Sequence, residues 1–120
     1  VLGAGNVGQF VGAHLISGAR KLGDDMKVLF VGRSVLRRTE EAGCLKCTDF
    51  QRPGEALHFS LPVPALELSE DPLSLQDCDI VFVCLKCSSA TDVGPLRTLR
   101  PGATVISLQN GVGNVKRLKE

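Results

Sequence analysis

The chain contains no tryptophan or tyrosine, and its 120 residues include only five phenylalanines and one methionine. It also has no excess of charge of one sign, because 14 Lys and Arg residues face 13 Asp and Glu residues, for a formal net charge of +1. Balanced charge argues against a nucleic-acid-binding module, which normally carries a concentrated basic excess. With 43% hydrophobic residues, the chain is also too apolar for a disordered tail.

Long hydrophobic runs are missing as well. The longest purely apolar run, Ile80 to Leu85, has six residues, whereas a membrane-spanning helix needs about 18 or more. We therefore expect neither a membrane nor a nucleic acid as a partner. A chain of this length is typical of one globular domain, which buries roughly two-thirds of the surface of its unfolded chain.

The five cysteines favour free thiols over a disulfide framework, because an odd number leaves one unpaired. We expect a reducing, cytoplasmic location. Cys44 and Cys47 form one CxxC pair and Cys84 and Cys87 another, and two such pairs can bind zinc. Because Cys84 belongs to a predicted strand rather than a tight turn, we expect no metal site. A zinc-binding interaction module remains an alternative.

Helical and strand patterns alternate along the chain. Apolar residues within 7–16 recur at steps of three and four, which is helical spacing. A second helix is expected over 34–43, with Ser34 as its N-cap, and a third within 88–99. Strands are expected at 27–31, 57–61, 79–85 and 103–108.

This alternation predicts an α/β fold, because right-handed crossovers place successive strands parallel to one another. We expect a Rossmann-type, doubly wound, mainly parallel sheet with helices on both faces. The strand at 79–85 is apolar from Ile80 onward, which predicts that both of its faces are covered. Neither His14 nor His58 has an acid or serine at a spacing diagnostic of a hydrolase.

A glycine motif opens the first predicted helix. Residues 3–8 read Gly-Ala-Gly-Asn-Val-Gly and match GxGxxG after a short apolar pair. In such a motif Gly3 permits the tight turn, Gly5 lets a pyrophosphate approach the backbone, and Gly8 lets helix and strand pack closely. The pyrophosphate would then lie on the free amides of the helix start. The alternative is a purely structural glycine turn.

The residues after the second strand select the cofactor. An NAD site needs an acid there for the ribose 2′-hydroxyl, but Asp24 and Asp25 precede that strand and so lie at its other end. Arg33 and Ser34 follow it, and a guanidinium and a hydroxyl suit a 2′-phosphate. With no acid at this position in the sequence to repel the phosphate, we expect NADP rather than NAD. The alternative is a surface arginine.

Two polar residues stand at the carboxyl ends of the later strands. Lys86 closes the strand at 79–85, and Asn110 follows the strand at 103–108. Ligands of open α/β sheets bind at these ends, so we expect both side chains to orient the nicotinamide ribose and the substrate. The alternatives are a lysine that reaches water and an ordinary Asn-Gly turn.

These residues together resemble a known family. The glycine motif at 3–8, Arg33, the strand that ends at Lys86 and the segment Ser-Leu-Gln-Asn-Gly-Val-Gly-Asn at 107–114 look like the N-terminal domain of ketopantoate reductase (2-dehydropantoate 2-reductase). The family reduces ketopantoate with NADPH to pantoate, which serves coenzyme A and pantothenate synthesis. The resemblance implies that the following residues bind NADP: Gly3, Ala4, Gly5, Asn6, Val7, Gly8, Arg33, Lys86 and Asn110. Ser34, chosen above for the 2′-phosphate, completes the expected site.

The resemblance also implies what this chain lacks. The family's catalytic lysine and its substrate-binding glutamate and asparagines lie in a helical C-terminal domain that residues 1–120 do not contain. We therefore expect an NADP-binding domain, truncated at its first strand, with no catalytic residue of its own. We expect a longer parent protein to be the 2-keto acid reductase. A homodimer is one assembly that this parent could form. The alternative is a non-catalytic NADP-binding or redox-sensing module.

Overall fold

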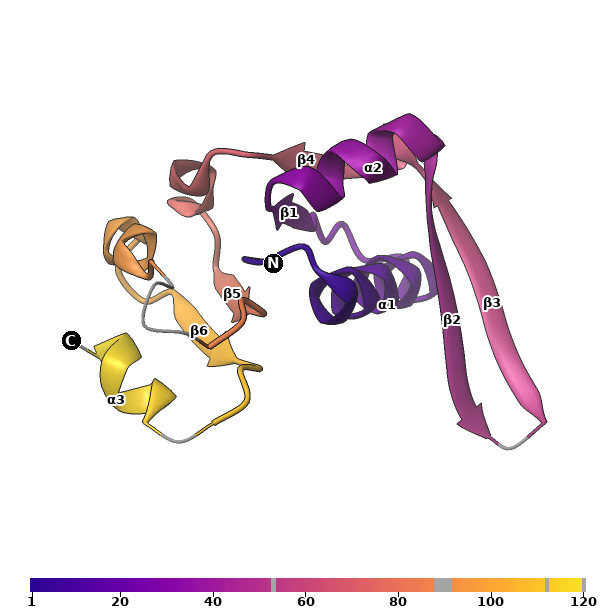
Figure 1. Ribbon diagram of the computed structural model, residues 1–120. Coiled ribbons are helices and arrows are strands. Elements are labelled where there is room, and N and C mark those ends of the chain that lie inside the picture. The colour runs from indigo at the N-terminus through magenta and orange to yellow at the C-terminus, as the bar shows by residue number, and fades with distance from the viewer. Residues whose placement is uncertain (53, 88–91, 112, 120) are drawn as a thin grey trace.

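The computed structural model describes residues 1–52, 54–87, 92–111 and 113–119 and shows a mixed α/β fold (Figure 1). Over these residues, three 3₁₀ helices accompany the α-helices and strands. None of the described helices is long and apolar enough to cross a membrane. The elements, in chain order, are α1 (Asn6–Leu22), β1 (Leu29–Val31), α2 (Ser34–Ala42), β2 (Cys44–Arg52), β3 (Glu55–Pro62), η1 (Val63–Ala65), β4 (Glu67–Ser69), η2 (Pro72–Leu75), β5 (Ile80–Val83), η3 (Gly94–Thr98), β6 (Thr104–Ser107) and α3 (Asn114–Lys119).

Two parallel strand pairs flank the start of the chain. β1 pairs with β4 and β5 pairs with β6, and Leu2 forms isolated parallel bridges to both Val31 and Val83. The Leu2 amide donates a hydrogen bond of 2.8 Å to the Phe82 carbonyl, and the Leu2 carbonyl accepts one of 2.8 Å from Cys84. The spatial order is therefore β4, β1, Leu2, β5 and β6, with the glycine motif leaving from the middle.

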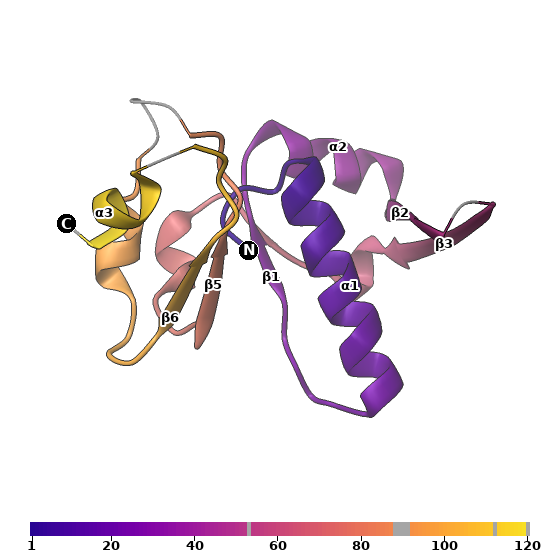
Figure 2. The same ribbon diagram turned by 90° about the horizontal axis from the view of Figure 1, so that it is seen from below.

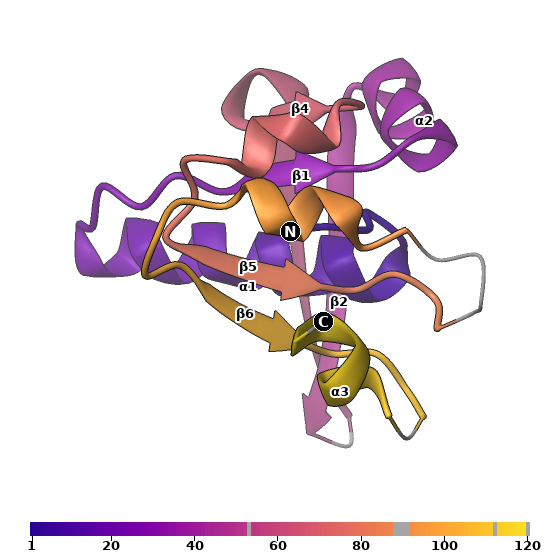
Figure 3. The same cartoon turned by 90° about the vertical axis from the view of Figure 1, so that its left-hand side faces the viewer.

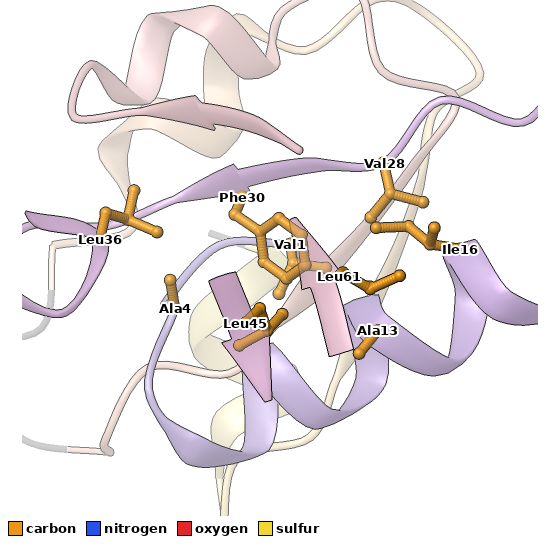
Figure 4. Close-up of a cluster of buried hydrophobic side chains, with 9 residues drawn as sticks. All are labelled: Val1, Ala4, Ala13, Ile16, Val28, Phe30, Leu36, Leu45 and Leu61. Carbon is orange, nitrogen blue, oxygen red and sulfur yellow. The ribbon is translucent and has the colours of Figure 1, made fainter. Parts of the chain in front are cut away.

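Apolar clusters lie on both sides of these strands. On one side, the Phe30 ring packs among side chains from α1, β2 and β3 (Figure 4). A Cβ on Gly12 of α1 would overlap this ring, so the glycine sets how closely the helix approaches. On the other side, Val81 and Val83 pack with Leu75 of η2, and Figure 3 shows α1 behind β5 and short helices in front of it.

The expectation that the strand at 79–85 is covered on both faces is wrong. Val81 and Val83 are fully buried, but Ile80 is 53% exposed. Ile80 and Phe82 line a cavity of about 620 Å³, together with Leu15 of α1 and the start of β1. The strand β5 therefore has one packed face, while its other face is open at the amino ends of the strands.

Two helix expectations also need correction. The second helix is present as α2, but Ser34 is its first residue and Arg33 occupies the N-cap position. Within the range 88–99 predicted to hold a helix, residues 94–98 form the 3₁₀ helix η3 rather than an α-helix, with Pro95 in its first turn. Residues 88–91 lie outside the described part of the chain.

An antiparallel hairpin, β2–β3, extends beyond α1 from the parallel strands (Figure 2). The predicted strand at 57–61 is confirmed within β3, whereas β2 was not expected. Leu45 and Asp49 are both buried in β2, and an acid at an inward position breaks the apolar alternation that marks a strand. Asp49 Oδ2 lies 3.1 Å from His14 Nε2 of α1, in contact but without hydrogen-bond alignment.

Candidate cofactor site

Two of the three motif glycines are required by close backbone packing. Gly3 has φ +95°, and a Cβ there would lie 2.7 Å from the Leu85 amide nitrogen, just beyond β5. A Cβ on Gly8 would overlap the Gly3 carbonyl oxygen. The turn therefore crosses directly over the end of β5, and larger residues at these two positions would push the helix away from the strands.

Gly5 differs, because a Cβ there would meet no atom within 4 Å. It is the N-cap of α1, it has no side chain to cap the helix, and the first turn contains no acidic residue. The first amides of a helix have no acceptor within the helix, and Asn6 and Val7 are exposed. The positive end of a 17-residue helix thus faces open space, which suits an anion.

The end of β1 lies beside this turn. The Gly3 amide donates to the Val31 carbonyl at 2.9 Å, and a Cβ on Gly32 would lie 2.9 Å from the Cβ of buried Ala4. Arg33 follows and is exposed. Ser34 begins α2, and its side chain lies outside the described part of the structure.

No acid follows β1 itself, but one lies at the end of the neighbouring strand β4. Glu70 follows β4, and its carboxylate accepts hydrogen bonds from Arg37 Nε at 2.7 Å and Nη2 at 3.1 Å. The hydrogen bond from Arg37, and then the charges of Arg37 and Arg33, hold the pKa of Glu70 below its ordinary value. Arg33 therefore shares its surroundings with a carboxylate that is already paired.

A side-chain amide connects the segments that follow β5 and β6 by a hydrogen bond. Gln109 Nε2 donates to the Leu85 carbonyl at 3.1 Å, which connects the segment before Lys86 to the segment before Asn110. Lys86 and Asn110 themselves are exposed. Because Leu85 also lies against Gly3, the structure brings the glycine turn and both of these segments together at the carboxyl ends of the strands.

Asn114 holds the loop that carries Asn110. Its side chain is 7% exposed, and Nδ2 donates to the carbonyls of Gln109, Asn110 and Gly111 at 3.1–3.3 Å. Its Oδ1 accepts a 2.8 Å contact from the Cys87 thiol. We predicted no role for Asn114 from the sequence, although it is the last residue of the segment at 107–114 and directly follows Gly113.

The two CxxC pairs lie on different elements. Cys44 and Cys47 are in β2, and Cys84 and Cys87 follow β5. Burial raises the pKa of both Cys47 and Cys84, which favours the protonated thiol over the thiolate that binds metals. Within the described residues, no three His, Cys, Asp or Glu side chains form a group that could hold a metal ion.

A glycine turn that opens a helix at the carboxyl ends of parallel strands is typical of dinucleotide-binding α/β domains. A family model described as "Ketopantoate reductase PanE/ApbA" matches residues 1–120. The chain therefore belongs to this family, whose members are NADP-dependent reductases, and the resemblance seen in the sequence is confirmed. No curated protein and no solved structure gave a significant match to the chain.

Proposed function

We propose that residues 1–120 bind NADPH and form the cofactor-binding half of an oxidoreductase that reduces a 2-keto acid, ketopantoate, to pantoate. The open, uncapped start of α1 carries this proposal, because Gly5 leaves room for a phosphate where a side chain would stand. When bound, NADPH supplies the hydride. The residues proposed to contact it are Gly3, Ala4, Gly5, Asn6, Val7, Gly8, Arg33, Ser34, Lys86 and Asn110.

Each part of this site has its own task. The first-turn amides of α1 bind the pyrophosphate, and the Arg33 guanidinium, with the Ser34 hydroxyl, binds the 2′-phosphate. Lys86 and Asn110 orient the nicotinamide ribose and the substrate carbonyl. The order of the parallel strands around Leu2 supports a Rossmann-type, doubly wound sheet for this domain.

The proposal assigns no catalytic residue to residues 1–120. The proton donor to the new hydroxyl and the groups that hold the keto acid would come from a helical C-terminal domain in a longer parent protein. On this view the present chain binds NADPH without turning over ketopantoate, and the parent, as a monomer or homodimer, carries out the reaction in the cytoplasm for pantothenate synthesis.

Fluorescence titration with NADPH and NADH tests the site. In Gly5→Ala the new methyl group meets no protein atom but occupies the pyrophosphate space, so both cofactors should bind at least about tenfold more weakly while the fold is retained. Arg33→Ala removes a charge-assisted bond to the 2′-phosphate, so NADPH binding alone should weaken by about ten- to a hundredfold. Arg38→Ala, at an exposed position of the helix that Arg33 caps, is the matched control.

Equal losses for the two cofactors in Arg33→Ala would contradict the NADP assignment. An assay with ketopantoate on a longer protein that includes the helical domain then tests the reaction. NADPH binding without turnover in that protein would favour the redox-sensing module over the reductase.

A further inference from the structure

The ion pair between Arg37 and Glu70 lies at the edge of the sheet where the adenosine end of the cofactor is proposed to bind. Parallel pairing sets Val31 of β1 opposite Ser69 of β4, and the Gly32 amide donates to the Ser69 carbonyl at 3.0 Å. Glu70 therefore lies beside Gly32 at the end of the neighbouring strand. Gly32 is the residue directly before Arg33 in the chain. Figure 1 and Figure 3 show α2, which carries Arg37, next to β4.

Both charged groups reach solvent, and thus a ligand. The side chains of Arg37 and Glu70 are 69% and 48% exposed. Arg33 is the N-cap of α2, four residues before Arg37, and the charges of both arginines act on Glu70. The two guanidinium groups and the carboxylate therefore form one charged cluster at the end of β1 and β4.

A free carboxylate in this place would favour the wrong cofactor. An acid after β1 would accept hydrogen bonds from the ribose 2′-hydroxyl of NAD, and a carboxylate on the neighbouring strand end would likewise repel a 2′-phosphate held by Arg33. In this structure both oxygens of Glu70 accept bonds from Arg37, at 2.7 and 3.1 Å. A bidentate pair of this kind orients the carboxylate toward Arg37 and offsets its charge.

We propose that Arg37 is a specificity-determining residue for NADPH, because it engages both oxygens of Glu70 and so keeps that carboxylate from opposing the 2′-phosphate on Arg33. The inference rests on the proposed function, since it takes Arg33 as the phosphate ligand. It assigns Arg37 an indirect role: Arg37 acts on Glu70 rather than on the phosphate.

A double-mutant cycle separates this role from direct phosphate binding. The dissociation constants for NADPH and NADH are measured by fluorescence titration at low salt for wild type, Arg37→Gln, Glu70→Gln and the double variant. Arg37→Gln should weaken NADPH binding about fivefold, and NADH binding should be unchanged or tighter. The double variant should return to within about twofold of wild type for NADPH, because the carboxylate is gone.

Arg38→Gln is the matched control, because it removes one positive charge from an exposed position of the same helix. It should change the NADPH constant by less than about twofold. Urea unfolding of each variant checks that the fold is intact, as expected for an exposed pair.

Two results would overturn the inference. No change in Arg37→Gln would show that Glu70 does not influence the site, and a double variant as weak as Arg37→Gln would show that Arg37 binds the phosphate directly. If Arg33→Ala removes the preference for NADPH while Arg37→Gln retains it, the proposed function stands and the inference alone fails. If wild type does not prefer NADPH over NADH, both fail.

Discussion

The two edges of the proposed site are built from different interactions. At the ends of β1 and β4, Arg33, Arg37 and Glu70 are exposed and charged. At the ends of β5 and β6, the buried amide of Asn114 bonds three backbone carbonyls. Charged groups in water are held loosely and respond to ligand charge and to salt, whereas buried amides fix a shape. One edge is thus suited to select a ligand, and the other to present side chains at fixed positions.

The largest effect is expected at the glycine turn between the two edges. In Gly8→Ala, the new methyl would overlap the Gly3 carbonyl and lie 3.1 Å from Val1 Cγ1. Backbone cannot move aside as a flexible side chain can, so unfolding should require about 3 kcal/mol less free energy. Urea denaturation followed by circular dichroism measures this difference.

Gly5→Ala provides the control for that substitution, because its methyl meets nothing within 4 Å. Its cost in stability should stay below about 1 kcal/mol, the typical difference between glycine and alanine at an N-cap. Similar denaturation midpoints for the two variants would contradict the close packing of the turn.

The next largest effect is expected at the edge formed by β5 and β6. Asn114→Ala leaves three carbonyls without their donor and should lower the free energy of unfolding by about 2 kcal/mol. The loss should be the same at low and high salt, because no charge is involved. Asn110→Ala, at an exposed position of the same loop, should cost less than about 0.5 kcal/mol. An equal loss of unfolding free energy in Asn114→Ala and Asn110→Ala would show that the buried amide of Asn114 does not hold this edge of the site.

The smallest effect on stability is expected at the edge formed by β1 and β4, and it should depend on pH. The hydrogen bond from Arg37 lowers the pKa of Glu70 from its ordinary value of 4.5. A lowered carboxyl pKa stabilises the fold above the unfolded-state value, and this contribution is lost as the pH falls through the folded-state value. The stability difference between wild type and Arg37→Gln should therefore be present at neutral pH and vanish in strong acid.

Thermal unfolding at several pH values measures that difference, and added salt at neutral pH should also reduce it. A difference that persists unchanged in acid and in high salt would mean that Arg37 stabilises the protein by packing rather than by its charge.

Local sequence patterns were sufficient for the central part of the fold. The glycine motif, the helical spacing after it and the apolar runs that became β1, β5 and β6 each depend on neighbouring residues, so a single sequence reveals them. The same holds for the positions of Arg33, Lys86 and Asn110 after the ends of these strands. Their proposed contacts with a cofactor stay predictions.

Interactions between distant residues could not be predicted in this way. Arg37 and Glu70 are 33 positions apart in the chain, and their pairing follows from the register of β1 and β4. The strand β2 was missed for a related reason, because the buried acid Asp49 is matched by His14 of another element. In these cases the deciding information is the tertiary partner, which no local pattern contains.

The contact between His14 and Asp49 has a consequence for how the hairpin is aligned. Successive residues of a strand face opposite sides, so a shift of one residue would turn Asp49 toward solvent and bring a neighbour to His14. The ring of His14 is also enclosed by Phe10 and Phe59, at centroid distances of 4.5 and 5.3 Å. A buried acid beside His14, in an otherwise apolar contact, therefore favours the observed register of the hairpin against α1 over slipped alternatives.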